Sequence, residues 1–342
     1  MKFDEQGVTR SSEGTDTEAR RQVESESHGP RTHVFVLNYR GRDFLAACIQ
    51  SLQTIEPPVG GWKLVVIDNG SDDSSVALIR ERFPELELIR NEGNLGYAGG
   101  NNVGIRAAMR QGAEFVALLN MDLRVHPRWL TELVAAADAN PVAALLGSRI
   151  LTEDGRLVEF DGRQFDPVTT SGGYSYSPAT ASSDRPYEAP YACGAALLLR
   201  VQALRDVGLF DPAFFAYHED VDLALRCWLL GHKVLQVPTS IVYHSGGGAG
   251  AGNAFRDYMG ARNSFLTVSK IFDSAAWRPH APALIQHFLP DRDPGRMQAS
   301  LAALHTLPRT LVYRRNLNSR AKVHYSKLMR TFEEMIKSSS ER

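Results

Sequence analysis

The sequence has few cysteines, no long apolar run and almost no net charge. Its three cysteines, Cys48, Cys193 and Cys227, are odd in number and far apart, which argues against a disulfide framework or zinc ribbon and fits a reducing cytoplasm. No apolar run approaches ~18 residues, so we expect no transmembrane helix, and the N-terminus lacks the apolar stretch of a secretory signal. With 38 Lys and Arg against 39 Asp and Glu, a nucleic-acid partner is not expected.

Residues 1–31 contain almost no large apolar side chains. Such a segment cannot bury enough surface to offset the entropy cost of ordering, so we expect a disordered N-terminal tail. The whole chain has 342 residues and is 43% hydrophobic, which is enough for a large α/β domain with appendages.

After the tail, short apolar runs alternate with segments of helical spacing. This alternation predicts βαβ units and a mainly parallel sheet flanked by helices, the α/β class. The predicted strands of this part are 34–37, 64–67, 86–89, 115–119 and 143–146, and the predicted helices are 43–53, 74–83, 97–111 and 127–139. Further on we expect hairpins and a long loop over 152–190, strands at 195–199, 234–237 and 241–243, helices at 201–207 and 219–230, and mostly helix beyond 250.

Polar residues follow two of the predicted strands. The second strand leads into Asp68 within VVIDNGSDD, and the fourth leads into Asn120-Met121-Asp122. Open α/β sheets bind ligands at the carboxyl ends of their strands. An Asp there can accept the imide N–H of uracil or thymine, and a carboxylate with phosphate oxygens suits Mg²⁺. The alternative for both segments is a helix N-cap.

A glycine-rich stretch, NEGNLGYAGGNN, covers residues 91–102. Its glycines allow close backbone approach to a ligand, and N–H groups at a helix start favour phosphate. It is neither GxGxxG nor GxxxxGK[ST], so neither a dinucleotide fold nor a P-loop is supported. The alternative is an ordinary loop that enters a helix.

Two later segments carry titratable groups. In FFAYHEDVD, Glu219, Asp220 and Asp222 begin a predicted helix, where the helix dipole explains one or two acids. The preceding aromatic residues would desolvate a carboxylate and suit it to base catalysis. His244, at the end of a predicted strand, could ligate a metal, although a single His is more often structural, and the glycines after it could form a mobile lid.

Taken in order, these segments resemble family 2 glycosyltransferases with the GT-A fold. The motifs are VLNY, VVIDNGSDD, NLGYAGGNN, LLNMD, ACGAALLLR, GLFDPAFFAYHEDVDLALR and VYHSGG, and they cover about residues 33–265. The resemblance is greatest to the bacterial branch with rhamnosyltransferases and galactofuranosyltransferases. It implies an inverting transferase that takes a sugar from a nucleotide-diphosphate sugar, with Mg²⁺ or Mn²⁺ as cofactor.

The resemblance also implies roles for individual residues. Asp220 matches the second acid of the family's ED signature, the catalytic base. Asp122 matches the last Asp of the metal-binding DxD motif, and His244 matches the His that completes this site in some members. The donor-binding residues that it implies are Asn38, Asp68, Asn94, Asn101 and Asn120.

One position departs from the family pattern. Asn120 stands where the DxD motif has its first carboxylate, so metal affinity is expected to be lower and Asn120 to hydrogen-bond ribose or phosphate. Glu219 and Asp222 are expected to orient the helix and to bind the acceptor or Arg226. Arg262 is a further candidate for contact with the acceptor or with phosphates.

The donor sugar is expected to be rhamnose linked to dTDP, with UDP-linked sugars next, and the acceptor a hydroxyl of a glycan or lipid-linked glycan. Two alternatives remain, a catalytically degenerate nucleotide-sugar-binding module and a nucleotidyltransferase. The second is disfavoured because the first strand leads into NYRGRDF and not into a basic glycine-rich stretch. A glycosidase would need paired carboxylates but neither the glycine-rich loop nor the metal-binding Asp.

The predicted domains are the tail 1–31, a GT-A catalytic domain 32–265 and a helical basic extension 266–342. Residues 301–342 hold nine Lys and Arg and three Glu, with apolar residues interleaved. This pattern predicts either docking on an anionic membrane surface or a helical cap packed on the catalytic domain. We therefore expect a cytoplasmic protein, peripheral on the inner face of the plasma membrane if the first alternative holds.

Overall fold

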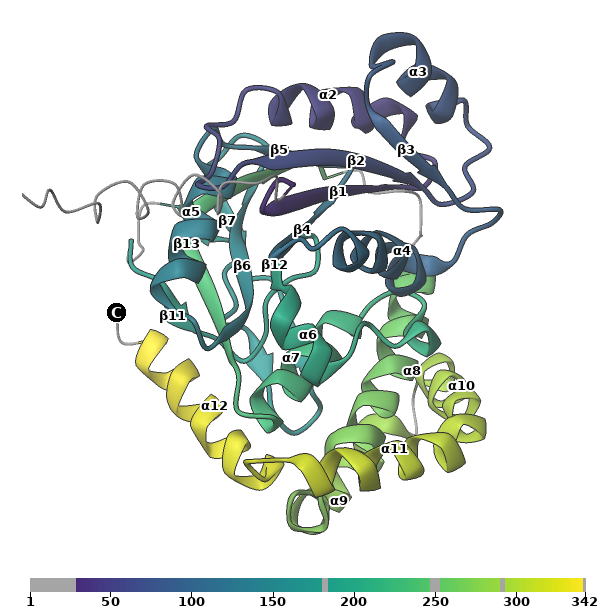
Figure 1. Cartoon of the computed structure of the whole chain (residues 1–342). Helices are drawn as coiled ribbons and strands as arrows, with labels where there is room; N and C mark the ends of the chain where they lie inside the picture. Colours follow the sequence, from purple (N-terminus) through teal and green to yellow (C-terminus); the bar gives the residue numbers. More distant parts are fainter. Residues whose placement is uncertain (1–28, 180–183, 247–252, 290–292, 341–342) are drawn as a thin grey trace, which may run out of the picture.

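The structure is a computed structural model that describes residues 29–179, 184–246, 253–289 and 293–340. Most of the predicted tail, residues 1–28, and the glycines after Gly246 therefore lie outside the described residues. Figure 1 shows a sheet with helices on both sides and a helical C-terminal part below it. The predicted α/β class with a mainly parallel central sheet is confirmed.

The first half of the sheet is parallel and has the order β3-β2-β1-β4. In register, Asn38 lies opposite Asp68 and Leu37 lies opposite Asn120, so the strands end at one level. Helices α2 and α3 cover one face and α4 covers the other (Figure 1), which is why β1, β2 and β4 contain continuous apolar runs, whereas the edge strand β3 has exposed ends. The bounds are β1 (Thr32–Asn38), α2 (Arg42–Leu52), β2 (Trp62–Asp68), α3 (Ser75–Arg82), β3 (Glu87–Arg90), α4 (Gly96–Arg110) and β4 (Phe115–Asn120).

The second half of the sheet is mixed. Strand β12 runs antiparallel between β4 and β6, and β13 runs parallel to β6. The two strands expected at 234–237 and 241–243 form the single strand β13, with a register shift between Val237 and Ile241. Pro238, which has no N–H to donate, falls within this shift. The bounds are α5 (Trp129–Ala139), β6 (Ala143–Thr152), β12 (Ala196–Arg200), α6 (Val201–Val207), α7 (Glu219–Leu229) and β13 (Lys233–His244).

Short strands complete the sheet, and β8 and β9 pair in a separate two-stranded sheet. Those after residue 152 lie where hairpins were expected, whereas β5 was not predicted. The three-residue strand β5 pairs with the end of β13 and sets Leu123 opposite His244. Strand β7 pairs with β6 at the edge, within the stretch 152–190. The bounds are β5 (Leu123–Val125), β7 (Leu157–Phe160), β8 (Phe165–Asp166), β9 (Ser171–Gly172), β10 (Ser177–Pro178) and β11 (Tyr187–Glu188).

The C-terminal part is helical, as expected. Its helices are α8 (Asn253–Ile271), α9 (Ser274–Phe288), α10 (Pro294–Ala303), α11 (Leu307–Arg320) and α12 (Tyr325–Ser340). Helix α12 returns to the sheet domain, where the ring of Phe332 lies 5.8 Å from Trp228 and 5.7 Å from Phe165. Helix α8 runs across residue 265, so the domain boundary expected there falls inside a helix. The division into a catalytic domain and an extension stays a prediction.

Candidate active site

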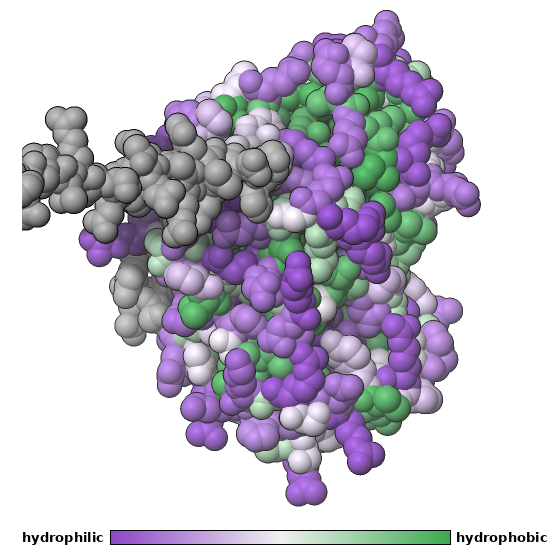
Figure 2. All heavy atoms as spheres, in the orientation of Figure 1, coloured by the Kyte–Doolittle hydropathy of each residue, from purple (hydrophilic) through white to green (hydrophobic). Residues whose placement is uncertain are grey.

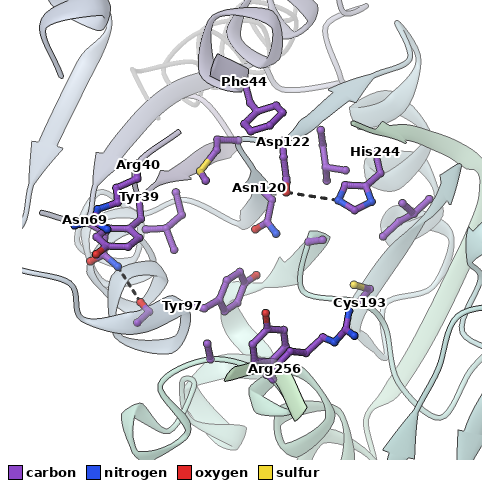
Figure 3. A pocket seen from close by; sticks show the side chains of 18 of the residues that line it. Tyr39, Arg40, Phe44, Asn69, Tyr97, Asn120, Asp122, Cys193, His244 and Arg256 are labelled. Atoms are coloured by element: carbon purple, nitrogen blue, oxygen red, sulfur yellow. Dashed lines mark hydrogen bonds and ion pairs between the residues drawn. The ribbon is translucent and has the colours of Figure 1, made fainter. Parts of the chain in front are cut away.

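An open cleft of about 1140 Å³ lies at the carboxyl ends of β1, β2 and β4. Figure 3 shows Tyr39, Arg40 and Asn69 together on one side of it and Asp122 with His244 on the other. The start of α4 and the loop before α7 also border the cleft. The lining residues used below are Tyr39, Asn69, Asn94, Gly96, Tyr97, Asn120, Asp122, Glu159, Cys193, Phe215, Tyr217, His244, Phe255 and Arg256.

Two predicted donor-binding residues, Asn38 and Asp68, lie beneath the cleft and do not line it. Both side chains are fully buried, and Asn38 Nδ2 donates to Asp68 Oδ1 at 3.0 Å and to Ser75 Oγ at 2.9 Å. The second carboxylate oxygen of Asp68 accepts from the Ser71 N–H at 3.3 Å. These hydrogen bonds hold the ends of β1 and β2 against the turn that follows β2. Contact of Asp68 with a nucleobase stays a prediction.

The glycine-rich loop places Asn94 and Asn101 differently. Asn94 lines the cleft and accepts hydrogen bonds at Oδ1 from Asn69 Nδ2 and the Gly96 N–H. Asn101 is buried on the inner side of α4, where Nδ2 donates to the Tyr97 carbonyl at 3.1 Å. Asn69, which was not among the predicted site residues, lines the cleft; its position directly after Asp68 at a strand end was the available signal.

The loop at the start of α4 touches the loop that enters α7. Gly96 has φ +71°, and a Cβ there would lie 2.3 Å from the Phe215 carbonyl oxygen. The same oxygen accepts the Ala98 N–H at 3.1 Å. Only glycine fits this left-handed, crowded position without displacing the neighbouring backbone. The two loops therefore border the cleft as one unit.

Asp122 and His244 meet across the β5–β13 pairing. His244 Nε2 lies 3.5 Å from Asp122 Oδ2, the ion pair drawn in Figure 3, and Nδ1 lies 2.7 Å from Glu159 Oε2. The Asp122 carboxylate, followed by Glu159, raises the pKa of His244 to about 9. Glu159 was missed in the sequence because β7, which carries it, has no distinct pattern.

The chemistry of this corner fits a divalent ion. Asp122 is 7% exposed, and its Oδ1 has no hydrogen-bond partner among the described residues. Glu159 holds one ring nitrogen of His244, in the way that metal-ligating histidines are usually oriented. The described residues include no group of three or more His, Cys, Asp or Glu that could hold a metal. A metal here would thus need phosphate oxygens to complete its coordination, as Mg²⁺ commonly does.

Asp220 lies in the first turn of α7, is partly exposed, and adjoins the cleft without being one of its lining residues. Its Oδ2 accepts the Gly194 N–H at 2.9 Å and its Oδ1 accepts the Val221 N–H at 2.8 Å, while Cys193, next to Gly194, lines the cleft. Burial raises the pKa of Asp220 above its usual range. Burial and the charge of Asp220 raise the pKa of Glu219 further, and Glu219 Oε2 has no hydrogen-bond partner in the described part of the chain.

The other predicted acceptor residues are turned away from the cleft. Asp222 and Arg226 form a buried ion pair at 2.9 Å, which is one of the two contacts expected for Asp222. Lys270 lies 2.8 Å from the same carboxylate. Arg262 borders a smaller cavity of about 360 Å³ and donates to the Ala213 carbonyl at 2.9 Å. Acceptor contact by these residues stays a prediction.

A strained loop precedes α7, and Asn263 of α8 holds it. Phe215, Tyr217 and His218 have φ between 61° and 68°, a region that costs a residue with a side chain about 1–3 kcal/mol. The buried Asn263 Nδ2 donates to the carbonyls of Phe214, Ala216 and Tyr217 at 2.7–2.8 Å. Of the two neighbours, the sequence singled out Arg262 and not Asn263, because an Asn in the middle of a helix gives no local sign of the loop that it binds.

We expect Asn263→Ala to lower turnover about tenfold or more with little change in donor KM, because the loop carrying Phe215 and Tyr217 loses its fixed conformation. The buried carbonyls left without a partner should also lower the free energy of unfolding by about 1–3 kcal/mol. Steady-state kinetics at saturating donor, with a urea titration beside them, measure both. The control is Asn316→Ala on the exposed side of α11. Loss of stability with unchanged kcat would limit Asn263 to a structural role.

Known proteins resemble this chain in sequence. Residues 33–208 match the profile of Glycosyl transferase family 2. The chain is 30% identical over 222 residues to the N-acetylglucosaminyl-diphospho-decaprenol L-rhamnosyltransferase of Mycobacterium tuberculosis. This match covers 59% of this chain and 70% of that protein. The chain is 22% identical over 224 residues to a dTDP-rhamnosyl transferase of Shigella flexneri, covering 60% and 71%.

Solved structures share the fold. A mannosyltransferase from Pyrobaculum calidifontis in complex with GDP-Man and Mn²⁺ matches with a TM-score of 0.54 at 16% identity, over 95% of this chain and 92% of that one. GalNAc-T7 with UDP, GalNAc and Mn²⁺ matches with a TM-score of 0.55 at 17% identity, over 83% of this chain but only 57% of that one. At these identities the likeness shows the fold alone, which is the expected GT-A fold.

Proposed function

The chain belongs to glycosyl transferase family 2, and we propose that it is an inverting transferase that moves rhamnose from a dTDP-linked donor to a hydroxyl of a lipid-linked glycan. One observation carries the proposal. A single cleft is bordered by the glycine-rich start of α4, by the Asp122–His244 corner and by the loop that leads to Asp220. These are the parts that a transferase needs for the donor phosphates, a metal ion and a base.

We assign the two sides of the cleft to the two parts of the donor. Tyr39, Asn69 and Asn94 offer an aromatic ring and amides on the side where β1 and β2 end, which suits a nucleoside. Asp122 and His244 would hold Mg²⁺ or Mn²⁺ on the other side, with Asn120 beside them for ribose or phosphate. When bound, the ion supplies Lewis-acid stabilisation for the departing diphosphate.

Asp220 acts as the base in this proposal. Its carboxylate takes the proton of the acceptor hydroxyl as the oxygen attacks the anomeric carbon from the side opposite the diphosphate. One displacement forms the new glycosidic bond, breaks the bond to the diphosphate and inverts the anomeric configuration. A raised pKa keeps the carboxylate a better proton acceptor than an exposed Asp.

The donor and acceptor rest on the relatives. Their names specify L-rhamnosyl transfer, dTDP-rhamnose and a decaprenyl-diphosphate-linked acceptor. Among the described residues, no helix has both the length and the apolar character needed to span a membrane. We therefore propose that a lipid-linked acceptor is reached by peripheral contact of the basic C-terminal helices with a membrane from the cytoplasmic side.

The test is a donor screen with Mn²⁺, Mg²⁺ and EDTA. We expect dTDP-rhamnose to raise the Tm in a metal-dependent way, to release dTDP, and to give, with a GlcNAc-diphosphate-lipid, a product of opposite anomeric configuration by NMR. UDP-sugars are the comparison. Binding without release of the nucleoside diphosphate from any donor would favour the degenerate binding module, and release of pyrophosphate from a nucleoside triphosphate and a sugar phosphate would favour the nucleotidyltransferase.

A further inference from the structure

A second, apolar groove of about 670 Å³ lies in the helical C-terminal part, away from the cleft. It is bordered by the end of α8 and by α9, α10 and α11. Its polar lining is small and consists of Ser269, Asp273, Ser274, Ser300, Arg314 and Asn318. The apolar lining is Phe265, Phe272, Trp277, Leu284, Ile285, Phe288, Leu289, Leu301, Leu304, Leu307 and Leu311.

Much of this lining is exposed to solvent. The most exposed apolar members are Ile285 at 57%, Leu301 at 47%, and Leu289 and Leu311 at 44% each. Figure 2 shows a hydrophobic area at the lower right, over the region of α10 and α11, with hydrophilic residues around it. Soluble proteins rarely leave apolar side chains gathered in one concave site unless a ligand or partner covers it.

Helices α10 and α11, which border the groove, carry basic side chains and no acidic ones, while Asp273, between α8 and α9, is the acidic residue of the lining. From Pro294 to Phe332 the chain has no Asp or Glu and eight Lys or Arg, which are Arg296, Arg309, Arg314, Arg315, Arg320, Lys322, Lys327 and Arg330. Arg314 lies in the groove lining itself and donates to the Phe272 carbonyl at 3.3 Å. Arg315 follows it on the exposed surface of α11. An apolar trough with cationic side chains at its border is complementary to a hydrocarbon chain that carries an anionic head.

Helix α8 connects the groove to the cleft. Phe255 and Arg256, in its first turn, line the cleft, and Phe265 and Phe272 line the groove. At a rise of 1.5 Å per residue, the distance along the helix from Arg256 to Phe265 is about 14 Å. Nine residues are about two and a half turns, so Arg256 and Phe265 project from opposite sides of α8, and the two sites are near one another along the helix and not in line on one face. The axial distance is short enough for one amphiphile to span, with a saccharide in the cleft, its hydrocarbon in the groove and a diphosphate between them.

We propose that this groove binds the hydrocarbon chain of the lipid-linked acceptor. The proposal deepens the function proposed above and rests on it only for the identity of the acceptor. A concave site of this size suits one hydrocarbon chain. The other occupants to be considered are a flat bilayer surface and a second copy of this protein. The experiment below separates these occupants.

The variant is Ile285→Gln with Leu304→Gln, two partly exposed groove residues, and the control is Val312→Gln, an apolar residue of α11 that is 72% exposed and outside the groove lining. Farnesyl diphosphate in EDTA is the binding probe, measured by calorimetry. We expect the double variant to bind it at least about tenfold more weakly than wild type, and the control to match wild type.

Kinetics give a second readout. With a long-chain GlcNAc-diphosphate-lipid, KM should rise about tenfold in the double variant, and with an acceptor that has no hydrocarbon chain KM should not change. Equal farnesyl diphosphate binding by both proteins would overturn the proposal. So would a wild-type dimer that the double variant dissociates, or loss of binding to anionic vesicles with unchanged probe binding. If no donor is turned over, the probe result still decides the groove, and only the transferase proposal fails.

Discussion

Asp220→Asn is expected to lower kcat by about 10²–10⁴-fold, because the amide keeps the size of the carboxylate but cannot take the acceptor proton. The dTDP-induced rise in Tm should remain near that of wild type, since Asp220 contacts backbone N–H groups and not the donor side of the cleft. Single-turnover assays at saturating donor and acceptor measure the loss.

The matched control is the neighbouring carboxyl. Burial and the charge of Asp220 raise the pKa of Glu219 well above its ordinary value, which favours the neutral form of this carboxyl. Glu219→Gln imitates that neutral form and should retain most of the turnover. Equal losses in both variants, or near wild-type turnover in Asp220→Asn, would remove Asp220 from the role of base.

The same residues set the pH dependence. Because burial raises the pKa of Asp220, kcat should fall on the acid side with a midpoint above the usual range of an Asp. Stability should change in the opposite direction. The folded state binds these protons more tightly than the unfolded state, so the free energy of unfolding decreases as pH rises from the unfolded pKa values through the raised ones.

Asp122→Asn is expected to lower kcat/KM by at least about a hundredfold in Mn²⁺ or Mg²⁺. Asp122 supplies the only carboxylate of the Asn120-Met121-Asp122 segment, so its loss leaves His244 as the one proposed protein ligand. The metal-dependent part of the donor-induced Tm shift should disappear, which a titration with Mn²⁺ and then EDTA measures.

The control for this variant is Asp154→Asn, which removes the same charge from an exposed turn between β6 and β7. It should not change the metal response. The Asp122 variant keeps the size of the side chain and loses only the charge of the ion pair with His244, because Oδ1 has no hydrogen-bond partner among the described residues, so we expect it to fold. A metal response that persists in Asp122→Asn would place the ion elsewhere in the cleft.

The parts that could be predicted from the sequence are those with a local cause. The run Val34–Leu37 is apolar throughout because helices cover both faces of β1, and its period alone indicates a buried strand. Asp122 and His244 could be singled out because each ends a strand, and strand ends meet at one edge of a sheet. Their proximity at 3.5 Å agrees with that reasoning.

The parts that could not be predicted depend on contacts distant in sequence. Glu159 reaches His244 only through the pairing of β7 with β6, and Asn263 reaches the loop before α7 only because α8 packs against it. The burial of Asn38 and Asp68 against one another likewise follows from the β1–β2 register. Local spacing carries no information on such pairs.

The contact between Gly96 and Phe215 limits how this sequence can vary. Any side chain at position 96 would collide with the carbonyl oxygen of Phe215 as well as with its ring, and the backbone oxygen cannot move aside as a side chain could. A homologue with alanine there must hold the loop before α7 elsewhere, and with it the approach to Asp220. By contrast, Gly93 has open space around it and is free to differ. In an alignment of relatives, glycine at position 96 is therefore the sign that the start of α4 and the loop before α7 meet as they do here.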